Sequence, residues 1–234
     1  MLPVRAPGVY TGAANVIAVL ILLAEFGMFR QALLRDQVRL YAGQSALIAL
    51  LAVLVGAVRS LPELYILAAV TVALKTIAIP VLLRRLLRET EPDHLVETGH
   101  DIAGSGGLSL ASTVLIGIVV AAFGFFSAGV LPAAGAEAGG APATALSVSI
   151  SVVLVAFVLM IHRRDVASQA IGLFSLENGI SLAALVIAAS LPLILEVALL
   201  FDLLLAVVVF GLLIRLHHGR AETLSTVDLT SLRG

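Results

Sequence analysis

The chain has 234 residues, of which 60% are apolar and 12% charged, and its mean hydropathy of +1.12 is far above that of an ordinary soluble domain. This composition indicates a membrane protein. Because a helix needs about 20 apolar residues to cross a hydrocarbon core of roughly 30 Å, the chain holds at most about eight or nine spans and no large soluble domain. The sequence has no cysteine, which excludes disulfides and thiolate-ligated iron–sulfur clusters. Its Lys and Arg residues form no stripe that would follow nucleic-acid phosphates.

Apolar runs separated by charged or Pro/Gly-rich breaks predict an all-α integral membrane bundle of about seven transmembrane helices. The expected spans are 13–29, 41–58, 62–83, 108–131, 145–161, 167–190 and 193–214. They divide the chain into three parts, namely an N-terminal three-helix segment (1–83), a cytoplasmic linker (84–107) and a C-terminal four-helix segment with a short cytoplasmic tail (108–234). The first span is expected to be retained, because no small-residue cleavage site accompanies it.

The basic residues lie asymmetrically between these spans. Arg5 and Arg59 lie on one side of the predicted bundle, and Lys75 lies inside it. The remaining eleven of the 14 basic residues lie on the other side, and they are Arg30, Arg35, Arg39, Arg84, Arg85, Arg88, Arg163, Arg164, Arg215, Arg220 and Arg233. Because cytoplasmic loops carry the excess of Lys and Arg, this distribution predicts an N-terminus outside and a C-terminus in the cytoplasm.

Several ionisable residues fall inside predicted spans, where each costs several kcal/mol and indicates a function by default. Lys75, Glu177 and Asp202 lie near the middle of spans three, six and seven. Glu196 lies nearer the outer face and Glu25 nearer the inner face. Burial penalises the charged form of each group and a neighbour of opposite sign stabilises it, so groups balanced in this way can exchange protons near neutral pH. A fixed ion network that only neutralises itself is the structural alternative.

Polar residues near these positions favour a hydrated interior path. Pro80 lacks an N–H and lies five residues after Lys75, so it is expected to free the carbonyl of Thr76 and to kink span three. Gln44 and Ser45 in span two need partners inside the bundle. Such small polar groups also serve as ordinary packing contacts between membrane helices.

Span six carries the sequence Glu177-Asn178-Gly179. The Asn178 amide offers donors beside the carboxyl group, and the glycine permits close helix approach. The five histidines show no metal-ligand spacing, and no phosphate-binding loop is present, so no metal or cofactor is expected in this chain.

Several of these segments, in the same order along the chain, resemble the membrane subunit called hydrogenase-4 component E, found in formate hydrogenlyase and related group 4 hydrogenases. The matching segments cover nearly the whole chain and are Tyr41-Ala-Gly-Gln-Ser45, Leu74-Lys-Thr-Ile-Ala-Ile-Pro80, Leu176-Glu-Asn-Gly-Ile-Ser181, Leu191-Pro-Leu-Ile-Leu-Glu196, Phe201-Asp202 and the tail 223–234. The last three predicted spans also resemble the K subunit of bacterial complex I and the C subunit of multisubunit cation antiporters. When Ile171-Gly-Leu173 is aligned with the K subunit, the glutamate position of that subunit falls on Phe174, three residues before Glu177.

The resemblance implies a multi-pass, non-catalytic subunit of the bacterial inner membrane that contributes to proton or sodium translocation. It makes Glu177 and Asp202 relay carboxyls that Lys75 joins or modulates, with Glu196 toward the outer exit and with Gln44 and Asn178 in support. The partners it implies are antiporter-like membrane subunits, a complex I-like membrane anchor, and peripheral hydrogenase and iron–sulfur subunits that hold the nickel-iron and iron–sulfur centres. The chain itself is then no enzyme and holds no cofactor.

Two functions of other classes stay open from the sequence. A free-standing proton or cation antiporter would need its own alternating access, yet the sequence shows neither internal repeats nor pairs of broken helices. A structural scaffold would use its intramembrane charges only to fix the register of its helices.

Overall fold

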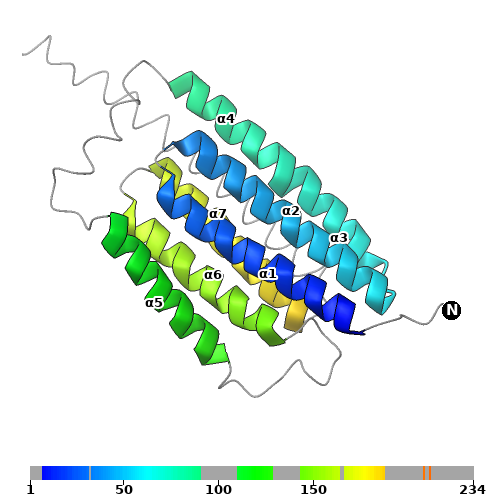
Figure 1. Cartoon of the computed structure of the whole chain (residues 1–234). Helices are drawn as coiled ribbons and strands as arrows, with labels where there is room; N and C mark the ends of the chain where they lie inside the picture. The colour runs from blue at the N-terminus through cyan, green and yellow to red at the C-terminus, as the bar shows by residue number, and fades with distance from the viewer. Residues whose placement is uncertain are drawn as a thin grey trace, which may run out of the picture.

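The computed structural model describes residues 7–31, 33–90, 110–128, 143–163, 166–187, 208 and 211. Within these ranges the chain is helical and contains no strand. Its elements, shown in Figure 1, are α1 (Pro7–Arg30), α2 (Leu34–Arg59), α3 (Glu63–Thr71), the π-helix η1 (Val72–Ala78), α4 (Ile79–Thr90), α5 (Leu110–Ala128), α6 (Ala143–His162) and α7 (Val166–Ile187).

Four described helices are long and apolar enough to cross a membrane. They cover Thr11–Arg30, Leu34–Arg59, Glu63–Arg85 and Thr144–His162, and Ala111–Ser127 forms a shorter apolar helix. Large hydrophobic side chains such as Phe123, Phe126 and Ile161 are exposed on the outside of the bundle, which suits contact with lipid tails. The chain is therefore a membrane-embedded helical protein. The seventh expected span (193–214) and the C-terminal tail lie outside the described residues, apart from positions 208 and 211.

Two helices extend beyond the expected spans, both at segments that carry arginine. α2 begins at Leu34 rather than at 41, because its first turns bury Gln37 and Val38 while the charged side chains of Asp36 and Arg39 pair on the outside at 2.8 Å. α4 continues to Thr90, into the segment 84–107 that is expected to be a linker. The first turns of α2 are thus amphipathic and keep one face in the bundle.

The third span follows one continuous helical path whose middle is the π-helix η1. In this wider turn the N–H of Ile79 bonds to the carbonyl of Leu74, five residues earlier. Pro80 follows directly and has no N–H to donate, so the α-helical bonding pattern is interrupted here in any case. Lys75 lies in the middle of η1 and is fully buried.

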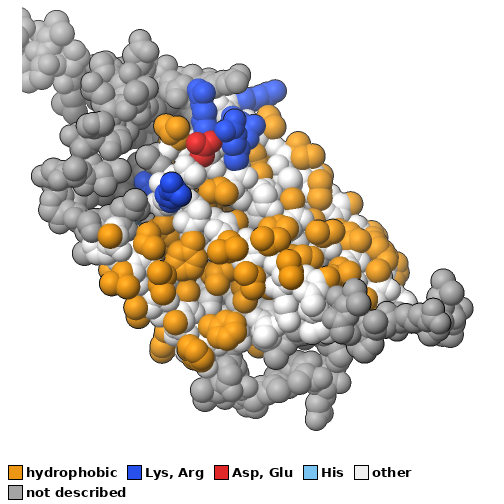
Figure 2. Space-filling model, viewed as in Figure 1, with side chains coloured by type: hydrophobic (Ala, Val, Ile, Leu, Met, Phe, Trp, Pro, Cys, Tyr) orange, Lys and Arg blue, Asp and Glu red, His pale blue; other side chains and the backbone are white. Residues whose placement is uncertain are grey.

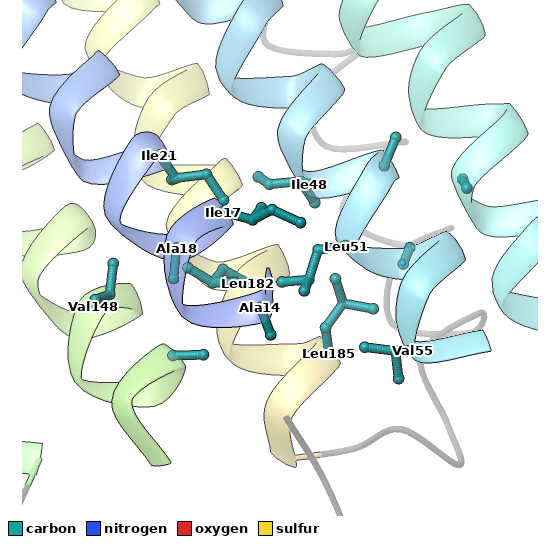
Figure 3. Close-up of a cluster of buried hydrophobic side chains, with 14 of the residues drawn as sticks. Ala14, Ile17, Ala18, Ile21, Ile48, Leu51, Val55, Val148, Leu182 and Leu185 are labelled. Carbon is teal, nitrogen blue, oxygen red and sulfur yellow. The ribbon is translucent and has the colours of Figure 1, made fainter. Parts of the chain in front are cut away.

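α6 packs between α5 and α7, α1 contacts α2 and α6, and α2 contacts α3, η1 and α7. Two groups of buried apolar side chains fill this bundle. The first apolar cluster, part of which is drawn in Figure 3, includes Ala14, Ile17, Ile21, Ile48, Leu51, Val55, Val148, Leu182 and Leu185, and also Leu64. The second apolar cluster includes Met28, Phe29, Val38, Tyr41, Ile79, Leu83, Val155, Leu159, Ile171 and Phe174.

Glycines bring α6 and α7 close together, as expected for the glycine that follows Asn178. A Cβ on Gly179 would lie 2.8 Å from Val153 Cγ2 and 3.1 Å from the Val153 main-chain nitrogen. A Cβ on Gly172, seven residues earlier, would lie 2.6 Å from Met160 Cγ. The glycine face of α7 is therefore held directly against α6, which leaves its other face for polar side chains.

Apart from Lys75 inside the bundle and Arg59 at the far end of α2, the described basic residues gather at the end of the bundle where α1 ends and α2 begins, as Figure 2 shows. Arg35 and Arg39 lie at the start of α2, and Arg84 and Arg85 lie in α4. At the same end Arg163 donates from Nη2 to the carbonyls of Met28, Phe29 and Gln31, at 3.3, 3.2 and 2.6 Å. A cation placed on these last carbonyls of α1 stabilises the negative end of its helix dipole.

Candidate functional site

A layer of buried polar side chains separates the two apolar clusters. Along α1 it falls between Ile21 and Met28, and along α2 it falls between Tyr41 and Ile48. The members of this polar layer are Glu25 on α1, Gln44 and Ser45 on α2, Lys75 on η1, and Ser175, Glu177, Asn178 and Ser181 on α7. Apolar side chains thus close the layer on both sides, at one depth of the bundle.

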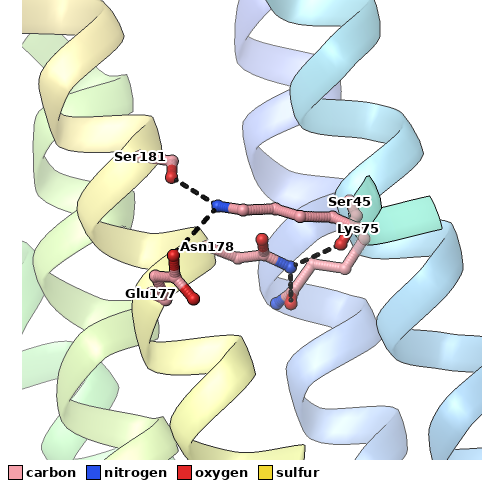
Figure 4. Close-up of polar contacts among 6 residues, drawn as sticks. Ser45, Lys75, Glu177, Asn178 and Ser181 are labelled. Atoms are coloured by element: carbon pink, nitrogen blue, oxygen red, sulfur yellow. Dashed lines mark hydrogen bonds and ion pairs between the residues drawn. The ribbon is translucent and has the colours of Figure 1, made fainter. Parts of the chain in front are cut away.

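Lys75 and Glu177 form an ion pair across the bundle. The Lys75 side chain extends from η1 to α7, where its Nζ lies 3.6 Å from Glu177 Oε1 and 3.0 Å from Ser181 Oγ (Figure 4). The lysine side chain is fully buried and that of the glutamate is 10% exposed. The structure therefore brings together two of the ionisable residues that the sequence places at mid-span. Their separation is longer than the roughly 2.7–2.9 Å of a tight charge-assisted hydrogen bond.

A network of amide groups links α1, α2 and α7 beside this pair. Asn178 Nδ2 donates to Gln44 Oε1 at 3.0 Å and to Ser45 Oγ at 2.9 Å. Gln44 Nε2 donates to Glu25 Oε2 at 2.9 Å and to the carbonyl of Ile21 at 3.4 Å. Every amide hydrogen of Gln44 and Asn178 is used in this way. The two residues predicted as supporting polar groups are thus hydrogen-bonded to each other, and Asn178 is next to Glu177 in the chain.

Glu25 belongs to the same layer, although the sequence analysis left it out of the predicted site. Its side chain is fully buried, and its Oε2 is hydrogen-bonded to the hydroxyl of Ser175, which also lies 2.9 Å from Gln44 Oε1. The serines of α7 were missed as well. Ser175, Asn178 and Ser181 recur at every third position, which places them on one face of the helix, and that spacing was the available signal.

The remaining predicted site residues are not placed by the structure. Glu196 and Asp202 lie outside the described residues. In the part of the chain that is described, no group of three or more His, Cys, Asp or Glu residues is arranged to hold a metal ion. The chemistry that the described layer offers is proton exchange among a lysine, two carboxyl groups and the hydroxyls beside them.

Comparison with known proteins finds a relative of most of the chain. The chain is 32% identical over 208 residues to the uncharacterized protein Rv0085 of Mycobacterium tuberculosis, and the match covers 86% of this chain and 85% of that protein. No protein-family model matches the chain, and no solved structure matches it.

Proposed function

The chain belongs to the same protein family as the uncharacterized protein Rv0085 of Mycobacterium tuberculosis. We propose that it is a non-catalytic subunit of a membrane-bound group 4 hydrogenase-type complex. Its role in that complex is to contribute buried ionisable residues to proton or sodium translocation. The observation that carries this proposal is the Lys75–Glu177 pair, which lies between two apolar clusters inside apolar helices. The order of the segments around Gln44, Lys75 and Glu177, shared with hydrogenase-4 component E, supports the type of complex.

The energetics of a buried ion pair favour ion transfer over a scaffold role. Taking two charges out of water costs several kcal/mol per ion, and well-packed hydrophobic residues of similar volume often serve stability equally well or better. Stability alone thus gives little reason to keep Lys75 and Glu177 in the bundle. Their 3.6 Å separation, with Ser181 as a second partner of the lysine, suits groups that exchange a proton.

The proton step uses only groups that face one another. A proton that passes from the Lys75 ammonium to the Glu177 carboxylate leaves a neutral amine and a neutral acid, so the net charge of the layer does not change. The amine keeps Ser181 as a hydrogen-bond partner, 3.0 Å away, while the electrostatic attraction to Glu177 is lost. The pair therefore has two protonation states of equal net charge, one charged and one neutral. An approaching proton can shift the population between them.

The proposal includes the remaining spans and the orientation of the bundle. Seven spans with the N-terminus outside put Arg35, Arg39, Arg84 and Arg85 on the cytoplasmic side, where basic residues accumulate, and leave Arg59 outside. The seventh span would add Asp202 as a second relay carboxyl and Glu196 toward the outer exit. Bacterial inner membrane is the location that fits this arrangement.

The proposed partners are antiporter-like membrane subunits, a complex I-like membrane anchor, and peripheral subunits that hold the nickel-iron and iron–sulfur centres. Electron transfer belongs to those subunits, since this chain has no cysteine for an iron–sulfur cluster. The chain by itself is therefore not expected to catalyse a reaction.

The test of the complex is purification through a tag on the C-terminus, from native membrane in a mild detergent. We expect antiporter-like subunits and a nickel- and iron–sulfur-containing arm to co-purify, and the eluate to reduce dyes with hydrogen. A chain that elutes alone, stable and monodisperse, would overturn the subunit assignment and make a free-standing antiporter the function to test next.

A further inference from the structure

The buried carboxyl group of Glu25 has no part in the pair described above, and its surroundings differ from those of Glu177. We propose that Glu25 is a proton-binding site of its own, which holds its proton in the polar layer and shares it with the hydroxyl of Ser175. The ligand of this site is a proton, and the residues that shape it are Ser175 and Gln44.

Charge is the first part of the argument. The hydrogen-bond partners of Glu25 are the Gln44 amide and the Ser175 hydroxyl, both neutral, and among the described residues no cation pairs with it. The cation that η1 brings to the layer, Lys75, is 3.6 Å from Glu177. A fully buried carboxylate without a cation costs several kcal/mol, and a bound proton removes that cost.

The positively charged groups on the neighbouring helices are engaged elsewhere. Arg163, at the end of α6 that faces the end of α1, donates to the carbonyls of Met28, Phe29 and Gln31. Arg39 on α2 pairs with Asp36 on the outside of the bundle. Neither arginine is hydrogen-bonded to the Glu25 carboxyl, whose hydrogen-bond partners Gln44 and Ser175 are neutral.

Hydrogen counting is the second part. Ser175 Oγ is within hydrogen-bond reach of both Glu25 Oε2 and Gln44 Oε1, and each of these oxygen–oxygen contacts needs a hydrogen between its atoms. The Ser175 hydroxyl has one hydrogen, and Gln44 Oε1 can only accept. A proton on Glu25 supplies the second hydrogen, so that Glu25 donates to Ser175 while Ser175 donates to Gln44.

The other carboxyl oxygen agrees with this count. Glu25 Oε1 is buried and accepts no hydrogen bond from the described residues. Both oxygens of a carboxylate share the negative charge and gain from donors, whereas the neutral acid tolerates a weakly partnered oxygen at a smaller cost. The same arrangement that is costly for a charged Glu25 is therefore acceptable for a protonated one.

The site has a defined place relative to the ion pair. Glu25 is hydrogen-bonded to Gln44, which is hydrogen-bonded to Asn178, the neighbour of Glu177 in the chain, so the layer contains a neutral acid and, beside its amide network, a paired carboxylate. The idea that Glu25 passes protons along a path rests on the proposed function. Its protonation does not, because it follows from local charge and hydrogen bonding.

Infrared spectroscopy of the full chain in lipid nanodiscs at neutral pH tests this site. A protonated carboxylic acid has a C=O stretching band that ionised carboxylates lack. We expect Glu25→Gln to remove one carboxyl equivalent of that band, and the matched variant Glu177→Gln to leave it unchanged. An unchanged band in Glu25→Gln, or a loss in Glu177→Gln alone, would overturn the proposal.

A second variant keeps the proposal testable if Glu25→Gln does not fold. Ser175→Ala retains the carboxyl group but removes its hydroxyl partner, so we expect the acid band to remain and to shift to higher wavenumber. A spectrum identical to that of the unchanged protein would overturn the proposed sharing with Ser175. Failure of the hydrogenase assignment would leave these spectra unaffected, so the two proposals fail separately.

Discussion

The polar layer has two halves, one around Glu25 and one around the Lys75–Glu177 ion pair. The two halves differ in the kind of polar group that joins their helices. In the Glu25 half, the amides of Gln44 and Asn178 use every hydrogen and join three helices. In the other half, the Nζ of Lys75 lies 3.6 Å from a carboxyl oxygen of Glu177 and 3.0 Å from the hydroxyl of Ser181. A fully connected amide network fixes helix positions, whereas an ammonium group on a flexible four-carbon chain can move between partners without moving its helix.

From this difference we infer that the two halves have separate roles. The amide network holds α1, α2 and α7 in register, and the ion pair is the part that can rearrange without moving a helix. The glycine face of α7 adds rigidity from behind, because Gly172 and Gly179 hold it against α6. Substitutions in the two halves should therefore have different consequences.

The largest effect is expected from removal of the lysine. Lys75→Met leaves the buried Glu177 carboxyl without its cation, and loss of one partner of a buried pair costs about 3–5 kcal/mol. We expect a corresponding loss in the free energy of unfolding, measured by denaturant titration in mixed micelles. The double variant Lys75→Met/Glu177→Gln should regain most of it. A double variant as unstable as the single one would show that the two residues do not form a coupled pair.

A smaller loss is expected from the amide network. Gln44→Leu removes the donor to Glu25 and the acceptor of Asn178, and each buried group left without a partner costs about 1–3 kcal/mol. Ser45→Ala removes only one acceptor and serves as the milder comparison. The same titration should rank Gln44→Leu well above Ser45→Ala. Equal stabilities would contradict the central place given to Gln44.

The smallest effect on stability is expected where the glycine face of α7 packs against α6. Gly179→Ala inserts a methyl group against the side chain and main chain of Val153, and such overpacking costs about 1–3 kcal/mol. Gly43→Ala is the matched control, because nothing lies within 4 Å of a Cβ there. That change should stabilise the protein by about 0.5–1 kcal/mol through helix propensity. Thermal unfolding curves that move in the same direction for both variants would contradict the close contact of α6 with α7.

Much of this fold follows from hydropathy alone. Each of the first six expected spans coincides with a described helix, and four of these helices are long and apolar enough to cross a membrane. The ends of α2 and α4 could not be predicted from hydropathy, since both helices continue into arginine-containing segments where mean hydropathy falls. The π-helix around Lys75 has no signature in residue type beyond Pro80, because it depends on a shift of main-chain hydrogen bonds.

The site was predicted in part for a related reason. Lys75 and Glu177 were found because a charge in hydrocarbon is conspicuous, and Gln44 and Asn178 because amides need partners there. Depth counted along one span placed Glu25 near its end, yet packing against α2 and α7 brings it into the layer. Serine carries no charge, so Ser175 and Ser181 become visible only once α7 is known to face η1 and α2.

The central claim is that Glu177 takes part in ion movement rather than only in packing. Inverted membrane vesicles that contain the native complex allow proton uptake and hydrogen-linked dye reduction to be measured side by side. Glu63→Gln, at an exposed carboxyl in the first turn of α3, is the matched control. We predict that Glu177→Gln keeps complex assembly and dye reduction while proton uptake falls far below that of Glu63→Gln. Proton uptake equal to that of the unchanged complex would contradict the claim and leave the pair a structural one.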